Sequence, residues 1–171
     1  MTSVQLSRGK AEAQLLFEIT LTMQDLGRLS ADLLLFYTQE FAYVELPDAF
    51  TTGSSIMPQK RNPDVFELVR ARGASALGCL NEALAICMKL PSGYQRDLQL
   101  LKAPLFRGID LAAQTLDIMA AGLEALKFRP DRIRLDPAVH AAEEAYALVV
   151  NEGIPFREAY RRVAARLARK D

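Results

Sequence analysis

Apolar residues that recur every three or four positions, over three long stretches, constrain the fold of this chain more than any other feature. Side chains with this spacing fall on one face of an α-helix, whereas a half-buried strand would alternate apolar and polar residues. One such stripe of apolar residues lies near the N-terminus, and two more run from Val65 to Met88 and from Ile109 to Leu126. The pattern predicts amphipathic helices. The first stripe comprises Ala11, Leu15, Ile19, Met23, Leu26 and Leu33.

Capping residues indicate where these helices begin and end. Asn62-Pro63-Asp64 has the order of an N-cap, a first-turn proline and a first-turn acid. Asp136-Pro137 repeats the cap and proline, and Gly153-Ile154-Pro155 separates the last two helices. We therefore predict helices near residues 8–41, 63–89, 98–128, 137–151 and 155–169.

The length of the first three predicted helices favours an all-α fold, an elongated bundle of long helices. At about 1.5 Å per residue, such helices span roughly 40–50 Å. Helices of this length do not fold around a small central core, so we expect their sides to pack against other subunits. We expect residues 1–128 to form the central bundle and residues 129–171 a small C-terminal helical part.

Composition and charge exclude several classes of protein. The 21 Lys and Arg residues balance the 21 Asp and Glu residues, so no net charge favours nucleic acid as a partner. No apolar run has membrane-spanning length and the first ten residues lack the apolar core of a signal peptide, so we expect a cytoplasmic protein with no membrane partner. Cys79 and Cys87 have neither disulfide nor zinc-ligand spacing, and His140 is the only histidine, so we predict no metal site.

Residues 51–63, TTGSSIMPQKRNP, form a loop of unusual composition between the first two long helices. The loop places a glycine, four hydroxyls, an amide and two cations just before a helix N-terminus. Backbone N–H groups and the helix dipole favour an anion at such a position, and Lys60 and Arg61 add positive charge. The residues alone leave two interpretations open: a site for a carboxylate or phosphate, or a solvated flexible loop that ends in an ordinary Asn cap.

The string GSSIMPQKRNP, residues 53–63, resembles the signature of the fumarase/aspartase superfamily, whose members eliminate fumarate from succinyl-type substrates. Within the superfamily, the sequence resembles argininosuccinate lyases rather than fumarases at two positions, Gln59 before Lys60 and Asp64 after Pro63. It also resembles argininosuccinate lyases in the flanking segments FAYVELPDAFTT and LPSGYQRDLQLLK. The resemblance extends over residues 5–166. It implies elimination of fumarate from argininosuccinate, with release of arginine, in arginine biosynthesis and without a cofactor.

The resemblance also implies roles for particular residues. Ser54 matches the family base, which removes a carbon-bound proton, and Lys60 and Asn62 match positions that hold the carboxylate whose charge grows in the transition state. Glu67 matches a glutamate that pairs with a histidine of another subunit. A serine hydroxyl is a poor base, so the site must stabilise its alkoxide. The substrate-binding residues implied are Ser55, Met57, Gln59, Tyr94, Arg96, Gln99 and Lys102.

The chain departs from the family pattern in two segments. Leu100 and Leu101 stand where the family often has two acids, and residues 141–144, AAEE, replace a commoner Ala-Thr-Asp. His140 does not match the catalytic histidine of the family, and we expect it to be a surface or packing residue.

Two signature regions that precede this one in the family have no counterpart in the chain, and family sites are assembled from three subunits of a tetramer. We therefore expect a fragment that has little activity alone. Its expected partners are a small-molecule substrate and either further copies of the chain or a complementary N-terminal portion. Two alternatives stay open: another fumarate-releasing lyase, such as adenylosuccinate lyase or an aspartase-like enzyme, and a non-catalytic helical assembly module.

Overall fold

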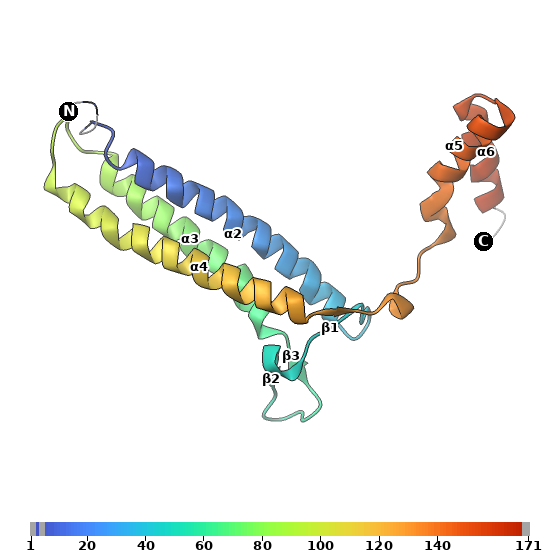
Figure 1. Cartoon of the computed structure of the whole chain (residues 1–171), viewed down its shortest axis with the longest axis horizontal. Coiled ribbons are helices and arrows are strands. Elements are labelled where there is room, and N and C mark those ends of the chain that lie inside the picture. Colours follow the sequence, from blue (N-terminus) through green and yellow to red (C-terminus); the bar gives the residue numbers. More distant parts are fainter. Residues whose placement is uncertain (1–2, 4–5, 169–171) are drawn as a thin grey trace. The chain divides into compact units, whose positions relative to one another are not determined.

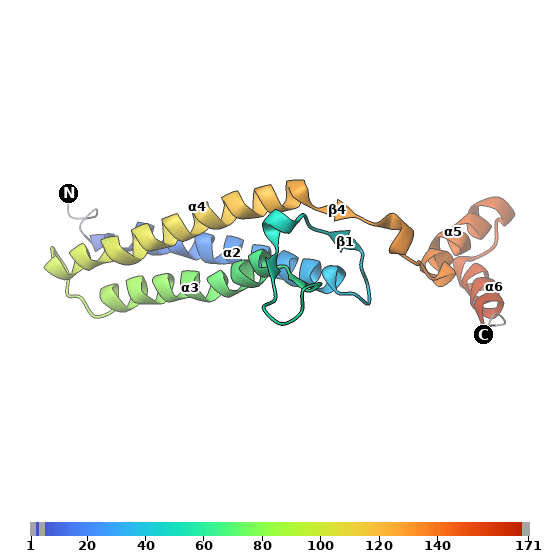
Figure 2. The ribbon, with the colours of Figure 1, turned by 90° about the horizontal axis from the view of Figure 1, so that it is seen from below.

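The structure is a computed structural model that describes residue 3 and residues 6–168. It divides into two compact units, residues 1–132 and residues 133–171. Three long helices lie side by side in the first unit: α2 (Lys10–Tyr37), α3 (Asp64–Cys87) and α4 (Lys102–Ala125) (Figures 1 and 2). The predicted all-α class is confirmed.

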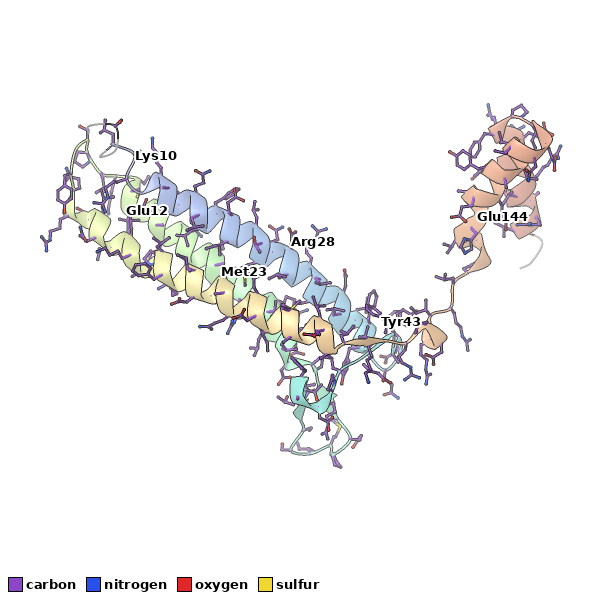
Figure 3. All side chains as sticks on the ribbon, viewed as in Figure 1. Lys10, Glu12, Met23, Arg28, Tyr43 and Glu144 are labelled. Carbon is purple, nitrogen blue, oxygen red and sulfur yellow. The ribbon has the colours of Figure 1, made fainter. Side chains whose placement is uncertain are left out.

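The three long helices bury only part of each predicted apolar stripe against one another. Leu15, Leu68 and Leu116 of these stripes are 45%, 63% and 47% exposed. Near the start of α2 the core contains Leu16, Cys79 and Leu101, and near its end it contains Leu33, Phe66 and Met119. Met23 lies between these two clusters and is fully buried among the helices (Figure 3). Burial of such side chains provides the main stabilisation, because each contributes roughly 1.5–3 kcal/mol.

Short elements connect the long helices at the end where α2 stops. They are β1 (Val44–Glu45), the 3-10 helix η1 (Asp48–Phe50), β2 (Thr52–Gly53) and β3 (Arg61–Asn62), and β4 (Lys127–Phe128) follows α4. Strand β1 pairs antiparallel with β4, and β2 pairs antiparallel with β3. At the other end, the 3-10 helix η2 (Arg96–Leu101) leads into α4.

Three predicted helix boundaries in the first unit were wrong: the end of α2 and both ends of α4. Helix α2 stops at Tyr37 rather than near residue 41, because the Thr38 N–H and hydroxyl both bond to the Leu35 carbonyl and the chain turns back through Ala42. The predicted helix 98–128 begins as η2, becomes α-helical at Lys102 and ends at Ala125, since the next residues pair with β1. Pro104 is accommodated because it lies in the first turn of α4, where its missing N–H costs little.

The second unit is a helical hairpin preceded by two short 3-10 helices, η3 (Pro130–Arg132), which closes the first unit, and η4 (Pro137–His140). Helices α5 (Ala141–Glu152) and α6 (Phe156–Leu167) meet at Gly153, whose φ of 65° ends α5 in the left-handed conformation. Ala145, Ala159 and Val163 form the buried core of this unit. Residue 169, the predicted end of the last helix, lies outside the described residues.

Among the described residues, no helix combines the length and apolar character needed to cross a membrane.

Candidate active site

A short hairpin stem holds the loop between α2 and α3. Thr52 pairs with Asn62 and Gly53 with Arg61. The Thr52 hydroxyl also donates a hydrogen bond to the Asp64 carboxylate. These contacts bring the two ends of the segment from Ser54 to Lys60 together at the start of α3.

Two aromatic side chains fix this hairpin to the bundle. Phe66 is fully buried in the first turn of α3 and belongs to the core cluster that includes Met119 of α4. A Cβ added at Gly122 of α4 would lie 3.8 Å from the Phe66 ring and 3.9 Å from Phe50. Phe50 precedes the loop and Phe66 follows it, so both ends of the loop are packed on the same part of α4.

Ser54 occupies a local turn that polarises its hydroxyl. Its Oγ accepts hydrogen bonds from the backbone N–H groups of Ile56, at 3.3 Å, and Met57, at 3.1 Å. Backbone donors aimed at one oxygen stabilise negative charge on it, as they do in an oxyanion hole. The two N–H groups are therefore positioned to stabilise negative charge on the Ser54 oxygen.

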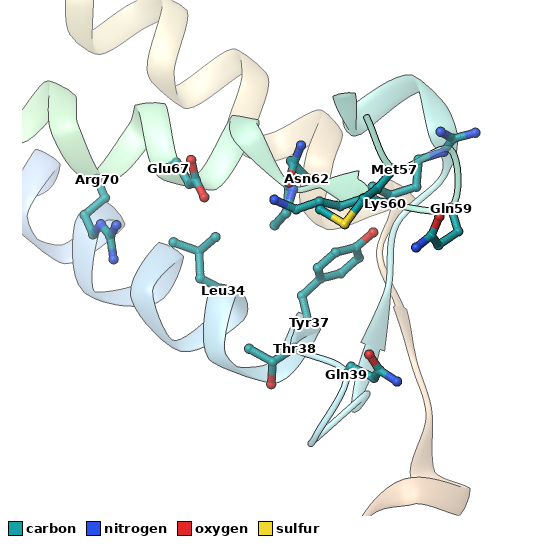
Figure 4. Close-up of a pocket in the computed structure, with 12 residues that line it drawn as sticks. Leu34, Tyr37, Thr38, Gln39, Met57, Gln59, Lys60, Asn62, Glu67 and Arg70 are labelled. Carbon is teal, nitrogen blue, oxygen red and sulfur yellow. The ribbon is translucent and has the colours of Figure 1, made fainter. Parts of the chain in front are cut away.

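An open cleft of about 780 Å³ lies beside the loop, between the end of α2 and the start of α3 (Figure 4). It brings together five of the predicted site residues from the loop and the first turn of α3, whereas Ser54 and Ser55 are not among its lining residues. The five are Met57, Gln59, Lys60, Asn62 and Glu67.

The cleft carries an excess of positive charge. Lys60, Arg61 and Arg70 line it, and Glu67 is its one acidic lining residue. Arg61 is paired with Asp48 at 3.2 Å, but within the described part of the chain Lys60 and Arg70 have no ion-pair partner. An unpaired ammonium and an unpaired guanidinium in one cleft favour an anionic ligand.

The end of α2 and the two residues after it also line this cleft, which the sequence did not predict. Leu34, Tyr37, Thr38 and Gln39 form the wall that faces the loop (Figure 4). Burial raises the pKa of the Tyr37 phenol; Asp48 raises it further and Arg61 opposes this shift. Tyr37 could have been recognised only as a polar aromatic at the end of an amphipathic helix.

The other four predicted binding residues lie at the opposite end of the bundle. Tyr94 accepts a hydrogen bond of 3.4 Å from Gln99, and Arg96 and Lys102 lie in the same connection between α3 and α4. Helix α3 separates this connection from the loop, and its 24 residues span about 36 Å. One chain therefore does not bring the two groups into a single site.

His140 belongs to the second unit, where it precedes α5. Its side chain is exposed, and its Nδ1 lies 3.1 Å from a Glu143 carboxylate oxygen.

Comparison with known proteins agrees with the fold and with the loop. A family model described as "Lyase" matches residues 2–78. The crystal structure of EDDS lyase in complex with formate superimposes with a TM-score of 0.70 and 28% identity, over 89% of this chain and 31% of that one. A class II fumarase from Schistosoma mansoni has the same fold, with a TM-score of 0.73 and 21% identity, over 97% of this chain and 35% of that chain. These two structures define the class of fold, the long-helix bundle that the chain shares with them.

Curated relatives match the chain more closely in sequence than these structures do. Argininosuccinate lyase from Sorangium cellulosum is 50% identical over 166 residues, which are 96% of this chain and 38% of the relative. The enzyme of the same name from Xylella fastidiosa is 45% identical over 94% of this chain and 36% of its own length. The chain is thus similar to argininosuccinate lyases over nearly all of its own length, and it spans little more than a third of the length of these relatives.

Proposed function

We propose that this chain provides the proton-abstracting loop of an argininosuccinate lyase, which splits argininosuccinate into arginine and fumarate. The observation that carries the proposal is the Ser54 turn, whose two backbone N–H groups point at Oγ beside a cleft with unpaired cations. Elimination needs these two features together, a base and a place for negative charge.

In the proposed reaction, the Ser54 alkoxide removes a proton from the carbon next to a substrate carboxylate. Negative charge then accumulates on that carboxylate, where Lys60 and Asn62 hold it. The electron pair forms the carbon–carbon double bond of fumarate while the carbon–nitrogen bond breaks, and the departing nitrogen takes a proton. Stabilising the charged intermediate lowers the barrier, because fixed donors in a site need no reorganisation.

The positions of the remaining proposed residues support a site built from more than one chain. We assign Ser55, Met57 and Gln59 to substrate contacts near the loop. Tyr94, Arg96, Gln99 and Lys102 would contribute from another copy, because their own loop lies about 36 Å away along α3. Glu67 has no ion-pair partner among the described residues and would pair with a histidine of another subunit.

We further propose a homotetramer that acts in arginine biosynthesis in the cytoplasm. The free thiols of Cys79 and Cys87 support a reducing compartment.

A chimera tests the proposal directly. The segment of the Sorangium cellulosum relative that matches this chain is replaced by the chain, and release of fumarate from argininosuccinate is measured by its ultraviolet absorbance. We expect activity in the chimera and a loss of roughly 10²- to 10⁴-fold in kcat in Ser54→Ala, as for removal of a general base. Ser75→Ala, which changes an exposed serine of α3, is the matched control.

Two results would contradict the proposal. One is a chimera that folds and assembles like the relative but releases no fumarate. The other is a Ser54→Ala chimera that is as active as the Ser75→Ala control.

A further inference from the structure

Tyr37 faces the loop from the opposite wall of the cleft. It is the last residue of α2, and its side chain is half-buried. Its ring extends from the helix toward the loop, and its hydroxyl lies beside Met57 and Lys60 (Figure 4). The residue is thus held by a helix on one side while its polar atom faces the site.

The Tyr37 hydroxyl is an uncommitted hydrogen-bond donor. It has no hydrogen-bond partner among residues 6–168. Burial raises its pKa above the ordinary value of 10.0, so the phenol keeps its proton at neutral pH and can donate it to an acceptor. A group that can donate, in a cleft with excess positive charge, suits an anionic oxygen.

Three of the side chains that line this cleft are hydrogen-bond donors of different chemistry. Lys60 contributes an ammonium, Asn62 an amide and Tyr37 a phenol. The ammonium attracts a carboxylate over a distance, whereas the phenol has one short, directional O–H bond. The phenol comes from α2, so its direction does not depend on the conformation of the loop.

We propose that Tyr37 is a further substrate-binding residue, whose hydroxyl donates a hydrogen bond to the carboxylate held by Lys60 and Asn62. This inference rests on the proposed lyase function, and it assigns α2 a direct part in recognising the dicarboxylate end of the substrate.

Titration of the chain with fumarate, followed by NMR, tests the inference. Tyr37→Phe removes only the hydroxyl. We expect it to raise the Kd for fumarate roughly tenfold, as for loss of a hydrogen bond to a charged group. Lys60→Ala should also weaken binding. Tyr43→Phe is the matched control, because Tyr43 packs against Phe36 and Phe41 and does not line the cleft.

A second measurement uses the unmodified chain and so does not depend on the folding of a variant. Fumarate should shift the Tyr37 ring resonances and leave those of Tyr43 in place. Equal Kd values for the chain and Tyr37→Phe, unshifted Tyr37 resonances, or no fumarate binding by the chain would each overturn the inference. The lyase function itself is judged by the chimera, so it can stand if the role of Tyr37 fails.

Discussion

Replacing Phe66 with alanine should destabilise the chain strongly, because this ring fixes the loop to the bundle. Phe66 is fully buried and belongs to the core cluster that includes Met119 of α4. Loss of a buried phenylalanine costs about 3–5 kcal/mol, from lost transfer free energy and from the cavity that remains. A unit of residues 1–132 has a free energy of unfolding of roughly 7–20 kcal/mol, so this loss is a large part of it.

Urea denaturation followed by circular dichroism measures the effect. With a urea dependence of about 2 kcal/mol per molar, the unfolding midpoint should fall by about 2 M. Leu68→Ala is the control, because Leu68 is on the same helix but 63% exposed, and its midpoint should move by less than about 0.3 M. Measurement at two protein concentrations separates folding from association of exposed apolar faces. Equal shifts for the two variants at both concentrations would refute this account of the loop anchor.

Two further predictions concern the ends of the bundle. Gly9→Ala should lower the free energy of unfolding by roughly 2–4 kcal/mol, measured by the same denaturation, because Gly9 has a φ of 89° and an added Cβ would overlap the Cys87 sulfur; an unchanged midpoint would contradict it. Hydrogen bonds from Arg129 lower the pKa of Asp131 below its ordinary 3.8, so the stability that Asp131 contributes is present above about pH 3.8 and is lost as the pH falls through its folded-state pKa. The unfolding midpoint of Asp131→Asn should therefore depend less on pH in acid than that of the unmodified chain, and identical pH profiles would show that the pair is not coupled to folding.

Long-range features of the fold could be predicted because they depend on periodicity. The predicted stripe correctly included Met23 and Leu33, which are buried, and the three predicted long helices exist. The prediction of Leu15 as a core residue was wrong, since Leu15 is 45% exposed and its neighbour Leu16 is buried. The end of α2 could not be predicted, since residues 38–41, TQEF, contain no glycine or proline. The helix stops there because the Tyr43 N–H bonds to the Phe36 carbonyl and β1 pairs with β4, which is a tertiary contact.

The candidate site likewise has a part that could be predicted from one segment of the sequence and a part that depends on the folded structure. The resemblance of the loop string to a family signature implied Ser54, Lys60 and Asn62, because the whole signature is contained in one segment. The turn that directs two N–H groups at Ser54 is a matter of backbone geometry, and the approach of Tyr37 depends on how α2 packs against α3. Neither the Ser54 turn nor the position of Tyr37 can be predicted from the spacing of residues in the sequence.

The arrangement of the bundle also bears on how a complete site would form. The loop lies at one end of α3 and the connection that contains Tyr94 and Gln99 at the other, so two copies can bring them together only when their bundles run in opposite directions. The long helices have apolar surface for such contact, since Leu77, Leu84 and Phe106 are 47%, 45% and 58% exposed. Apolar area of this kind favours association, and opposed pairing would place the loop of each copy beside the far connection of the other. A substitution in the connection of one copy would then impair a site whose serine belongs to the other copy. Mixing a Ser54→Ala chimera with a Gln99→Ala chimera should therefore restore part of the fumarate release, since some sites would have both residues intact. A site contained within one chain would gain no activity from the mixture.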